Sequence, residues 1–366
     1  MVHKKNKRAK RALAAIALCL LVLFSFLMTI GCTPAVKKYS DSFAGCFDTV
    51  ITIVAYTDSE TQFQQWFSLA EDRFWSLHRL YDIYQTYPDL NNLCTVNEKA
   101  GIAPVQVDQE IIDLLLFAKK TDRLSPGTVN IAFGPVLSIW HDIWMRSLNN
   151  EPFSLPAQSE LETADRLCDP DQVVIDESAG TVYLKKQGMK LDVGAIAKGY
   201  AAELVARDLI SEGLTSGIVS AGGSNVRLIG KPADGRDTWQ IGIQNPFSVS
   251  TDENPPMDVL LVNDLSVATS GDYQRYFEIN GTRYHHLIDT KTLNPARFYR
   301  SVTVLAPDSG MADYLSTALF LLPYEEGQSL ISRLDSCEAL WIFPDREIKM
   351  TDGMRHYLKS NQNIRH

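Results

Sequence analysis

The sequence predicts an α+β fold, with a single compact domain in which mixed or antiparallel sheets are flanked by helices. Segments with strand and helix patterns alternate along the 366-residue chain, and there are no internal repeats or low-complexity tracts. The two loops rich in Pro and Asn, at 149–156 and 245–256, are too short to be convincing linkers between domains. We therefore expect one folded unit around a large core.

The N-terminal half begins with a strand and an amphipathic helix. Residues 50–56 are rich in Val, Ile and Thr, which predicts a strand. Residues 61–84 carry apolar side chains at helical spacing, which predicts a helix that is buried along one face. A second helix is expected at 111–121, and a hairpin of two strands at 173–176 and 181–185.

The C-terminal half alternates short strands with two helices. A strand is expected to end at Leu191, and a helix to run from about Ile196 to Ser211, where Gly213 closes it. The apolar run from Met311 to Leu321 has the composition and length of a buried helix. The other expected strands lie at 217–220, as a pair within 226–244, and at 259–262, 274–279, 284–288 and 302–305.

The N-terminus has the pattern of a bacterial lipoprotein signal. A basic stretch from Lys4 to Arg11 precedes an apolar run from Ala12 to Ile30, which ends at Gly31-Cys32. An uncleaved transmembrane anchor is the alternative, because the run is close to the roughly 20 residues that a membrane span needs. In either case the body of the protein lies outside the cytoplasm and is tethered to the cell membrane.

The lipoprotein interpretation divides the chain into three parts. It predicts a signal peptide at 1–31, a lipid-anchored tether at 32–42 that starts with the lipidated Cys32, and a folded domain at 43–360. Cleavage removes six basic and no acidic residues, so the mature chain is six charges more negative than the −9 of the full sequence. Such an acidic chain has no basic footprint for nucleic acid.

The cysteines give no sign of a metal or redox motif. Cys46, Cys94, Cys168 and Cys337 are widely spaced and include no C-x-x-C pair, which argues against a zinc site or a thioredoxin-like centre. An oxidising compartment would permit disulfides, but nothing in the sequence pairs these four residues.

A candidate cation site lies in the apolar helix near the C-terminal end. Asp313 and Thr317 are four residues apart, which places a carboxylate and a hydroxyl on the same helical face. These oxygens leave most of an octahedral shell open, which suits Mg²⁺ shared with a phosphate-bearing substrate. The alternative is an ordinary polar pair near a helix start.

The segment from Leu191 to Tyr200 is the densest chemical signal in the chain. A strand is expected to end there, Gly194 permits a turn, and a helix begins with free N–H groups that can bind phosphate. The glycine spacing matches neither the dinucleotide-binding nor the P-loop motif. The alternative is that Gly194 and Gly199 only permit close packing and that Lys198 is a surface charge.

Three further segments carry glycine or histidine where a ligand could approach. Residues 220–225 and 269–273 are expected to be glycine-containing turns that let a ligand approach the main chain. The third segment, 284–289, supplies His285 and His286 beside Asp289. Successive residues of a strand point to opposite sides, so at most one of the two imidazoles is expected to face a given site.

Together, the ordered motifs resemble the ApbE family of FAD:protein FMN transferases. The resemblance covers nearly the whole mature chain and is carried by Phe47-Asp48-Thr49-Val50 and by segments 127–135, 191–200, 222–225, 269–273, 286–289 and 302–319. It implies an ApbE-like domain related to the T-fold, and a Mg²⁺-dependent enzyme. That enzyme would cleave the pyrophosphate of FAD, attach FMN by a phosphoester bond to a Ser or Thr of a partner protein, and release AMP.

The resemblance also implies the roles of individual residues. It assigns FAD contacts to Asp192 and Lys198 and to a stretch of Thr128, Val129 and Asn130, in which Asn130 stands where Asp is frequent. It further assigns contacts to Phe47, where many relatives have Met, and to Leu287, which replaces the usual Ile. An aromatic residue should stack on the flavin, and we favour Tyr84 over Tyr87. The metal ligands are the backbone carbonyl of Ala195 and the side chains of Asp313 and Thr317.

The remaining expectations concern the base and the partners. His286 is the candidate general base for the acceptor hydroxyl, because imidazole titrates near neutral pH, and Asp289 is the alternative. Thr290 and Leu293 replace residues that are frequently Pro and Gly, so the resemblance does not predict the shape of their loop. The resemblance implies acceptors among the membrane-bound subunits of ion-pumping NADH:quinone and ferredoxin:NAD oxidoreductases.

Two other classes of function use part of the same features. A hydrolase that splits FAD into FMN and AMP would need the same metal and pyrophosphate site, with water in place of the acceptor hydroxyl. A flavin-binding lipoprotein without catalytic activity would need no metal.

Overall fold

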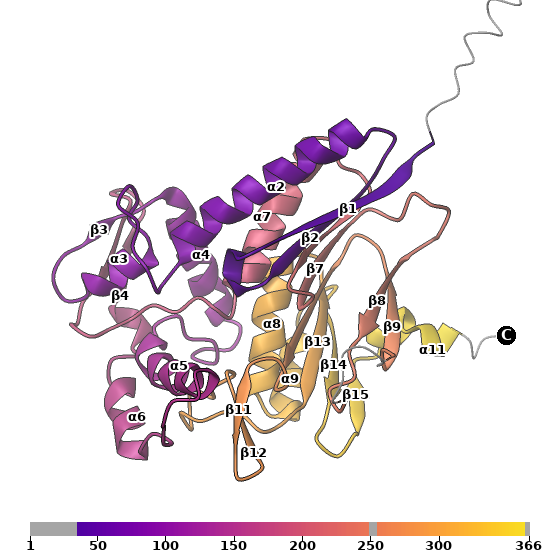
Figure 1. Cartoon of the computed structure of the whole chain (residues 1–366). Helices are drawn as coiled ribbons and strands as arrows, with labels where there is room; N and C mark the ends of the chain where they lie inside the picture. The colour runs from indigo at the N-terminus through magenta and orange to yellow at the C-terminus, as the bar shows by residue number, and fades with distance from the viewer. Residues whose placement is uncertain (1–34, 249–254, 363–366) are drawn as a thin grey trace, which may run out of the picture.

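The computed structural model describes residues 35–248 and 255–362, and it is built around one eight-stranded antiparallel sheet with the order β1-β2-β6-β7-β10-β13-β14-β15 (Figure 1). Its strands are β1 (Lys37–Ala44), β2 (Val50–Thr57), β6 (Gly217–Ala221), β7 (Asn225–Ile229), β10 (Ser266–Gly271), β13 (Ser301–Ala306), β14 (Glu338–Ile342) and β15 (Ile348–Met350). Every pairing in this sheet is antiparallel, so the predicted α+β architecture is confirmed.

Three small antiparallel sheets complete the strands. They consist of β3 (Val105–Gln106), β5 (Thr181–Leu184) and β4 (Val173–Asp176), of β8 (Trp239–Ile243) with β9 (Asp258–Val262), and of β11 (Tyr276–Ile279) with β12 (Thr282–His285). The last pair, β11 and β12, forms a hairpin whose residues line the main cavity of the molecule. Figure 1 shows it at the same end of the molecule as helix α5 (Gly134–Leu148).

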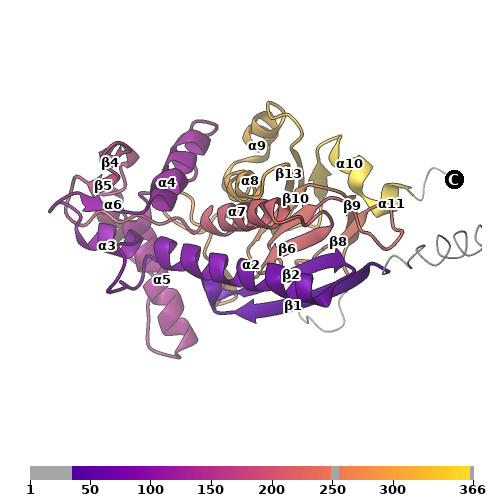
Figure 2. The same cartoon turned by 90° about the horizontal axis from the view of Figure 1, so that it is seen from above.

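The other helices surround the large sheet and the N-terminal part of the chain. They are α2 (Glu60–Tyr81), α3 (Leu93–Glu98), α4 (Gln109–Asp122), α6 (Gln158–Asp165), α7 (Ala197–Ser211), α8 (Ser309–Leu321), α9 (Tyr324–Ile331), α10 (Met354–Tyr357) and α11 (Lys359–Gln362), with short 3-10 turns at Cys46–Asp48 and Pro170–Gln172. Figure 2 shows α3 to α6 grouped on one side of the molecule, away from β8, β9, α10 and α11. No described helix is both long and apolar enough to cross a bilayer.

Both faces of the large sheet are buried, which explains its apolar central strands. Along β14, Ala339 and Trp341 belong to one hydrophobic core, whereas Leu340 and Ile342 belong to another. This alternation is the two-residue period of a strand with apolar layers on both sides. Helices α2, α7 and α8 pack on the first face, and β8, β9 and α10 cover the second.

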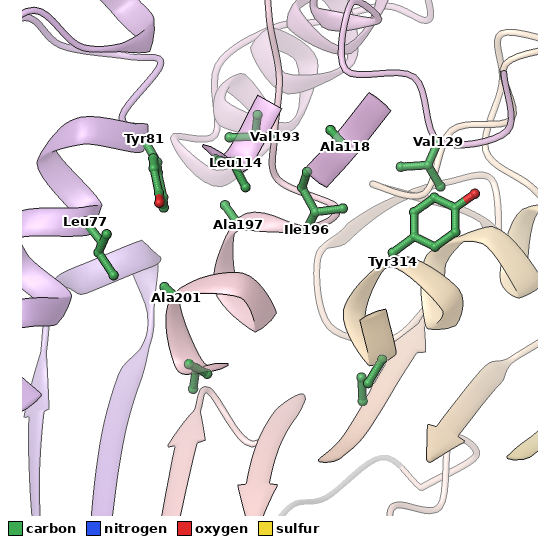
Figure 3. Packing of buried hydrophobic residues seen from close by; sticks show 14 of the residues in the cluster. Leu77, Tyr81, Leu114, Ala118, Val129, Val193, Ile196, Ala197, Ala201 and Tyr314 are labelled. Atoms are coloured by element: carbon green, nitrogen blue, oxygen red, sulfur yellow. The ribbon is translucent and has the colours of Figure 1, made fainter. Parts of the chain in front are cut away.

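The first core continues between the helices. Figure 3 shows Leu77 of α2, Leu114 of α4 and Ala197 and Ala201 of α7 converging on one buried region. The small alanines on α7 let the neighbouring helices approach closely, and α7 is in turn packed against the sheet. The start of α7, at the edge of the site described below, is thereby fixed in position.

Several boundaries differ from the sequence prediction. The tether predicted at 32–42 is too long, because Lys37–Ser42 already pair with β2 in the edge strand β1. The predicted pair of strands within 226–244 is wrong, because β7 pairs with β6 and β10 whereas β8 pairs with β9. Gly230, at φ +55°, turns the chain out of the large sheet between β7 and β8.

Two further expectations near the site also change. The turn predicted at 269–273 is largely strand β10, which ends at Gly271. The strand predicted to end at Leu191 is reduced to a single bridge between Phe133 and Lys190. Helix α5 was not expected from the sequence. The cysteines Cys46, Cys94, Cys168 and Cys337 are buried and unpaired, and Cys32 lies outside the described residues.

Gly199 controls the distance between α7 and α8. A Cβ atom at this position would clash with the backbone oxygen of Ser309 and with the Cβ of Asp313. These are backbone and near-backbone atoms that cannot move aside without shifting a helix. The sequence hypothesis that Gly199 permits close packing is therefore correct. The N–H of Gly199 also donates a hydrogen bond to Asp313.

We predict that Gly199→Ala lowers the free energy of unfolding by about 1–3 kcal/mol, because overpacking forces the two helices apart. Gly327→Ala in α9 is the matched control: there the nearest neighbour of a new Cβ is the flexible Cδ2 of Leu319, at 3.3 Å. The control should change stability by less than about 1 kcal/mol, since alanine favours helix over glycine. Urea unfolding of both variants measures the difference, and equal stabilities would contradict this account of the α7–α8 contact.

Candidate functional site

A cavity of about 580 Å³ lies between α5, the β11–β12 hairpin, the start of α7 and helix α8. Sheet residues close one end of it, including Ser224 and Asn225 at the β6–β7 turn and Thr269 and Ser270 of β10. The cavity therefore collects segments that are far apart in the sequence. Eleven of the sequence-predicted site residues line it, namely Tyr84, Thr128, Val129, Asn130, Asp192, Ala195, Lys198, His286, Leu287, Asp313 and Thr317.

Phe47 is placed differently from the other predicted flavin contacts. It does not line the cavity, and its ring packs against Phe74, His78 and Tyr81. Its φ of 51° is in the left-handed region, which a phenylalanine rarely adopts. The neighbouring Asp48 lines the cavity instead.

Asp313 connects α8 to the start of α7. Its Oδ2 accepts a hydrogen bond of 2.8 Å from the backbone N–H of Gly199, the third residue of α7. The carboxylate therefore caps a helix N-terminus, where negative charge is favourable. Its side chain is almost fully buried at the cavity wall. No described residue donates a hydrogen bond to the other oxygen, Oδ1.

Thr317 lies one turn further along α8 and also lines the cavity. Its Oγ1 is 3.3 Å from the Oγ of Ser270, which is in turn 2.9 Å from the Oγ of Ser316. These hydroxyls join α8 to β10 beside Asp313. The predicted pairing of Asp313 and Thr317 on one helical face is confirmed as geometry.

The donor set at this wall is compatible with a hard cation. Asp313 offers a free carboxylate oxygen, Thr317 a hydroxyl oxygen, and Ala195 lines the same cavity with its backbone carbonyl as the only oxygen it can offer. No group of three or more His, Cys, Asp or Glu suited to a metal occurs within 35–248 and 255–362. A cation bound at this wall would therefore depend on substrate phosphate or water for the rest of its coordination.

Asp192 links the start of α7 to the segment 128–131. Its N–H donates to the carbonyl of Ile131 at 2.8 Å, and its Oδ1 accepts from Gly194 N–H at 2.8 Å. Burial raises the pKa of the Asp192 carboxyl, and His141 and Arg275 oppose that rise. A raised pKa makes this carboxyl easier to protonate than an Asp in water.

Asn130 has a structural reason to be an amide. Its Nδ2 donates to the carbonyl of Cys168 at 2.6 Å, and its Oδ1 accepts from the N–H of Ala132 at 2.8 Å. An ionised Asp could not make the first of these bonds, because a carboxylate only accepts. The amide therefore fixes the backbone of the stretch from Thr128 to Asn130 at the cavity wall.

The opposite wall is aromatic. Tyr84 is 61% exposed and stacks on His141, with ring centroids 4.8 Å apart. Trp144 lies 5.7 Å from His141 on the next turn of α5. Tyr87 does not line the cavity, and the guanidinium of Arg79 covers its ring. The preference for Tyr84 over Tyr87 as a stacking residue is thus consistent with its position.

The sequence reasoning missed His141, Trp144 and Arg275, all of which line the cavity. The signal for the first two was available, because Leu137, Trp140, His141 and Trp144 follow the helical spacing of α5. All four of these residues line the cavity. Arg275 carried no pattern of its own.

His286 is held by the backbone of Arg275. Its N–H donates to the Arg275 carbonyl at 3.1 Å, and its Nδ1 lies 3.3 Å from the same oxygen. A carbonyl only accepts, so Nδ1 carries the proton and Nε2 keeps a free lone pair. His286 is exposed to the cavity, but the cavity walls partly shield it from bulk water, which lowers its pKa, and the positive charges of Arg275 and Lys198 add to this effect. The imidazole is therefore neutral at pH 7 and accessible from the cavity.

His285 points the other way and has a structural role. Its Nε2 donates to the carbonyl of Ala296 at 2.7 Å, and Leu287 N–H donates to its Nδ1 at 3.2 Å. Both nitrogens are satisfied only in the neutral ring. Burial lowers the pKa of His285 to about 4. The alternative base, Asp289, does not line the cavity, and its oxygens accept from Lys291 N–H and Thr292 Oγ1.

We predict that His285 makes the fold sensitive to acid. The folded pKa of about 4 is below the ordinary value of 6.5, so this stability is fully present above pH 6.5 and is lost as the pH falls toward 4. The loss should be at most about 3 kcal/mol for a shift of this size. Urea unfolding of His285→Gln, which cannot titrate, should depend less steeply on pH between 6.5 and 4 than that of the unaltered protein. Identical pH slopes would refute the role of this ring.

Comparison with known proteins identifies the family and supports the fold. A model of the ApbE family matches residues 47–341. An FAD:protein FMN transferase of Treponema pallidum is 35% identical over 296 residues, covering 78% of this chain and 79% of that protein. Another, of Klebsiella pneumoniae, is 30% identical over 285 residues and covers 76% of this chain and 85% of that protein.

Solved structures show the same fold. The ApbE protein of Thermotoga maritima has a TM-score of 0.75 and 26% identity, and the match covers 88% of this chain and 99% of that one. The flavin transferase ApbE of Vibrio cholerae has a TM-score of 0.71 and 24% identity, covering 90% and 99% of the two chains, and supports the fold alone. On the extent of the family match and on this shared fold, the chain belongs to the ApbE family.

Proposed function

We propose that this chain is an FAD:protein FMN transferase that uses Mg²⁺ to attach FMN to a Ser or Thr of another protein. One observation carries the proposal: a single cavity joins an aromatic wall at Tyr84 and His141 to a wall with a buried carboxylate, a helix N-terminus and Lys198. The first wall suits the flat ring of a flavin, and the second suits a pyrophosphate.

The residues near Asp313 would hold the metal ion. Asp313, Thr317 and the Ala195 carbonyl provide oxygen ligands, and Mg²⁺ there would supply positive charge that neutralises phosphate oxygens. Lys198 lines the same cavity without an ion-pair partner among the described residues. The N-terminus of α7 adds its partial positive charge.

The reaction needs a base for the acceptor hydroxyl. The free Nε2 of His286 takes the proton while the hydroxyl oxygen forms a bond to the phosphorus of the FMN moiety. The bond from that phosphorus to the bridging oxygen breaks, and AMP leaves with that oxygen. A neutral imidazole is the required starting form. The anionic substrate raises its proton affinity by compensating the neighbouring positive charges of Arg275 and Lys198.

The experiment that tests the proposal supplies FAD, Mg²⁺ and a candidate acceptor domain with an accessible Ser or Thr. We expect slow AMP release without acceptor, faster release with acceptor, and a flavin that remains bound to the acceptor after denaturation. His286→Ala should slow transfer by about 100-fold or more while changing FAD affinity far less. Rapid release of free FMN and AMP whether or not an acceptor is present would favour the hydrolase instead. FAD binding without any cleavage would favour a flavin-binding protein.

Metal dependence has its own test. Asp313→Asn keeps an oxygen for the Gly199 N–H but removes the charge, so the fold should survive while activation by Mg²⁺ is lost. The surface variant Asp352→Asn, whose carboxylate is fully exposed, controls for the loss of one negative charge. When the metal is chelated, we expect the activities of the unaltered protein and of Asp352→Asn to fall to the level of Asp313→Asn. Near-normal turnover of Asp313→Asn at low Mg²⁺ would rule out this site.

We also propose that the protein is a lipoprotein anchored through Cys32 outside the cytoplasm. Its acceptors would then be membrane-associated redox proteins of the kinds that the family resemblance implies. Because β1 starts at Lys37, the chain between anchor and sheet spans only about 17 Å when extended. Such a short connection would keep the enzyme near the membrane surface, which raises the effective concentration of membrane-bound acceptors.

Cys32→Ala should leave the full-length precursor unprocessed, because the lipidated cysteine is the residue at which such precursors are cleaved. Mass spectrometry of the membrane fraction measures this. An unaltered protein that retains an unmodified peptide from Met1 to Leu13 would show instead that the apolar run is an uncleaved anchor.

A further inference from the structure

Arg275 is a cation that lines the cavity and has no counterion in the part of the chain that the structure describes. Its side chain is partly exposed and lines the cavity between β10 and β11. Across 35–248 and 255–362, no carboxylate lies within ion-pair distance of its guanidinium, and no residue accepts a hydrogen bond from it. Lys198 is the other Lys or Arg that lines this cavity, and it has no ion-pair partner there either.

The guanidinium groups of three neighbouring arginines do have partners. Arg300 and Arg283 both pair with the buried Asp272, at 2.6 and 3.6 Å. Arg297 stacks on the ring of Tyr284 at 5.4 Å, and its Nη1 donates to the carbonyl of Arg283. Among these arginines of the described chain, Arg275 is therefore the one whose guanidinium has no ion-pair, hydrogen-bond or ring partner. A guanidinium kept partly out of water without a counterion is poised for an anionic ligand.

The position of Arg275 relative to the base is fixed by the backbone. Its carbonyl holds both the N–H and the Nδ1 of His286, so the two residues form one unit at the base of the β11–β12 hairpin. The charge of Arg275 acts on Tyr84, His141 and Asp192 as well as on His286. Arg275 lines the same cavity as the aromatic wall and His286.

The proposed role of His286 indicates which anion Arg275 would bind. The hydroxyl that gives its proton to Nε2 must attack a phosphorus atom close to the imidazole. Arg275 and Lys198 both act electrostatically on that imidazole. A planar guanidinium can bind two oxygens of a phosphoryl group at once, which a lysine ammonium cannot do with the same geometry.

We propose that Arg275 is a further catalytic residue, which binds the phosphoryl group of the FMN moiety as that group passes from the pyrophosphate to the acceptor hydroxyl. This rests on the proposed function. The bond that forms joins the acceptor oxygen to phosphorus, the bond that breaks joins phosphorus to the oxygen that leaves with AMP, and the proton goes to Nε2 of His286. Arg275 transfers no proton and stabilises the negative charge on the phosphoryl oxygens.

The test compares Arg275→Ala and Arg275→Lys with Arg297→Ala, a matched control that removes a guanidinium from the same region but not from the cavity wall. We expect kcat for FMN transfer to fall by about 100-fold or more in Arg275→Ala, as for the loss of one charge-stabilising group. FAD affinity should change by less than about 10-fold, and Arg297→Ala should stay close to the unaltered enzyme. Arg275→Lys should recover only part of the rate, because it restores charge without the planar fork.

Chemical rescue separates catalysis from folding. Added guanidinium ion should increase the rate of Arg275→Ala and leave the rate of Arg297→Ala unchanged, which a structural defect would not allow. An Arg275→Ala enzyme with near-normal kcat would overturn the inference. A variant that only raises KM for the acceptor, with unchanged FAD cleavage by water, would overturn it too, since the guanidinium would then bind a carboxylate of the acceptor.

Failure of the proposed function gives a different result. If the unaltered enzyme releases free FMN and AMP and labels no acceptor, the transferase proposal fails. The effect of Arg275→Ala on AMP release then still decides whether Arg275 acts on the phosphoryl group. If the unaltered protein cleaves no FAD with Mg²⁺ present, both proposals are overturned.

Discussion

The hydrogen bond from Gly199 N–H to Asp313 Oδ2 is the interaction on which the site depends. It exists only because residue 199 has no side chain, so that α7 and α8 can approach to backbone contact. It satisfies an amide at the start of α7 and fixes the orientation of a buried carboxylate. One contact therefore positions both the helix N-terminus and the acidic group that face the cavity.

The rest of the fold supports this contact from both sides. Helix α8 packs on β10 and β13, and α7 packs on β6 and β7, so neither helix can shift without disturbing the large sheet. Because apolar layers cover both faces of that sheet, its strands form a rigid platform. The hydroxyls of Ser270, Ser316 and Thr317 then link the platform to α8 beside the carboxylate.

The anionic substrate that we propose would enter a cavity whose positive charges are not neutralised by the described residues. Lys198 and Arg275 have no counterions among the residues that the structure describes, and Asp192 is buried enough for its pKa to rise. Unpaired and partly buried charges are unfavourable in free energy, and the packing of the surrounding fold offsets this. Such an arrangement is typical of sites that are organised in advance of binding. Desolvation in the cavity lowers the pKa of His286, and the positive charges of Arg275 and Lys198 add to this effect.

The sequence by itself determined the class of fold, four of the described helices, and eleven of the residues that line the cavity. Periodic patterns predict α2, α4, α7 and α8, because an amphipathic or buried helix records its environment in its own spacing. The same helical spacing predicted that Asp313 and Thr317 lie on one face of α8. The ordered motifs resembled one family, and the structure brings eleven of the predicted site residues to one cavity, whereas Phe47 packs outside it.

Only the tertiary structure decided features that depend on distant partners. The sequence could not show that Asp313 caps α7, since the two residues are 114 positions apart. It also could not show that β8 leaves the sheet of β7, or that Asn130 binds the carbonyl of Cys168. Arg275 looked like any surface arginine. Its significance comes from lacking a counterion within 35–248 and 255–362 while its carbonyl holds the imidazole of His286, and that is a property of the three-dimensional arrangement.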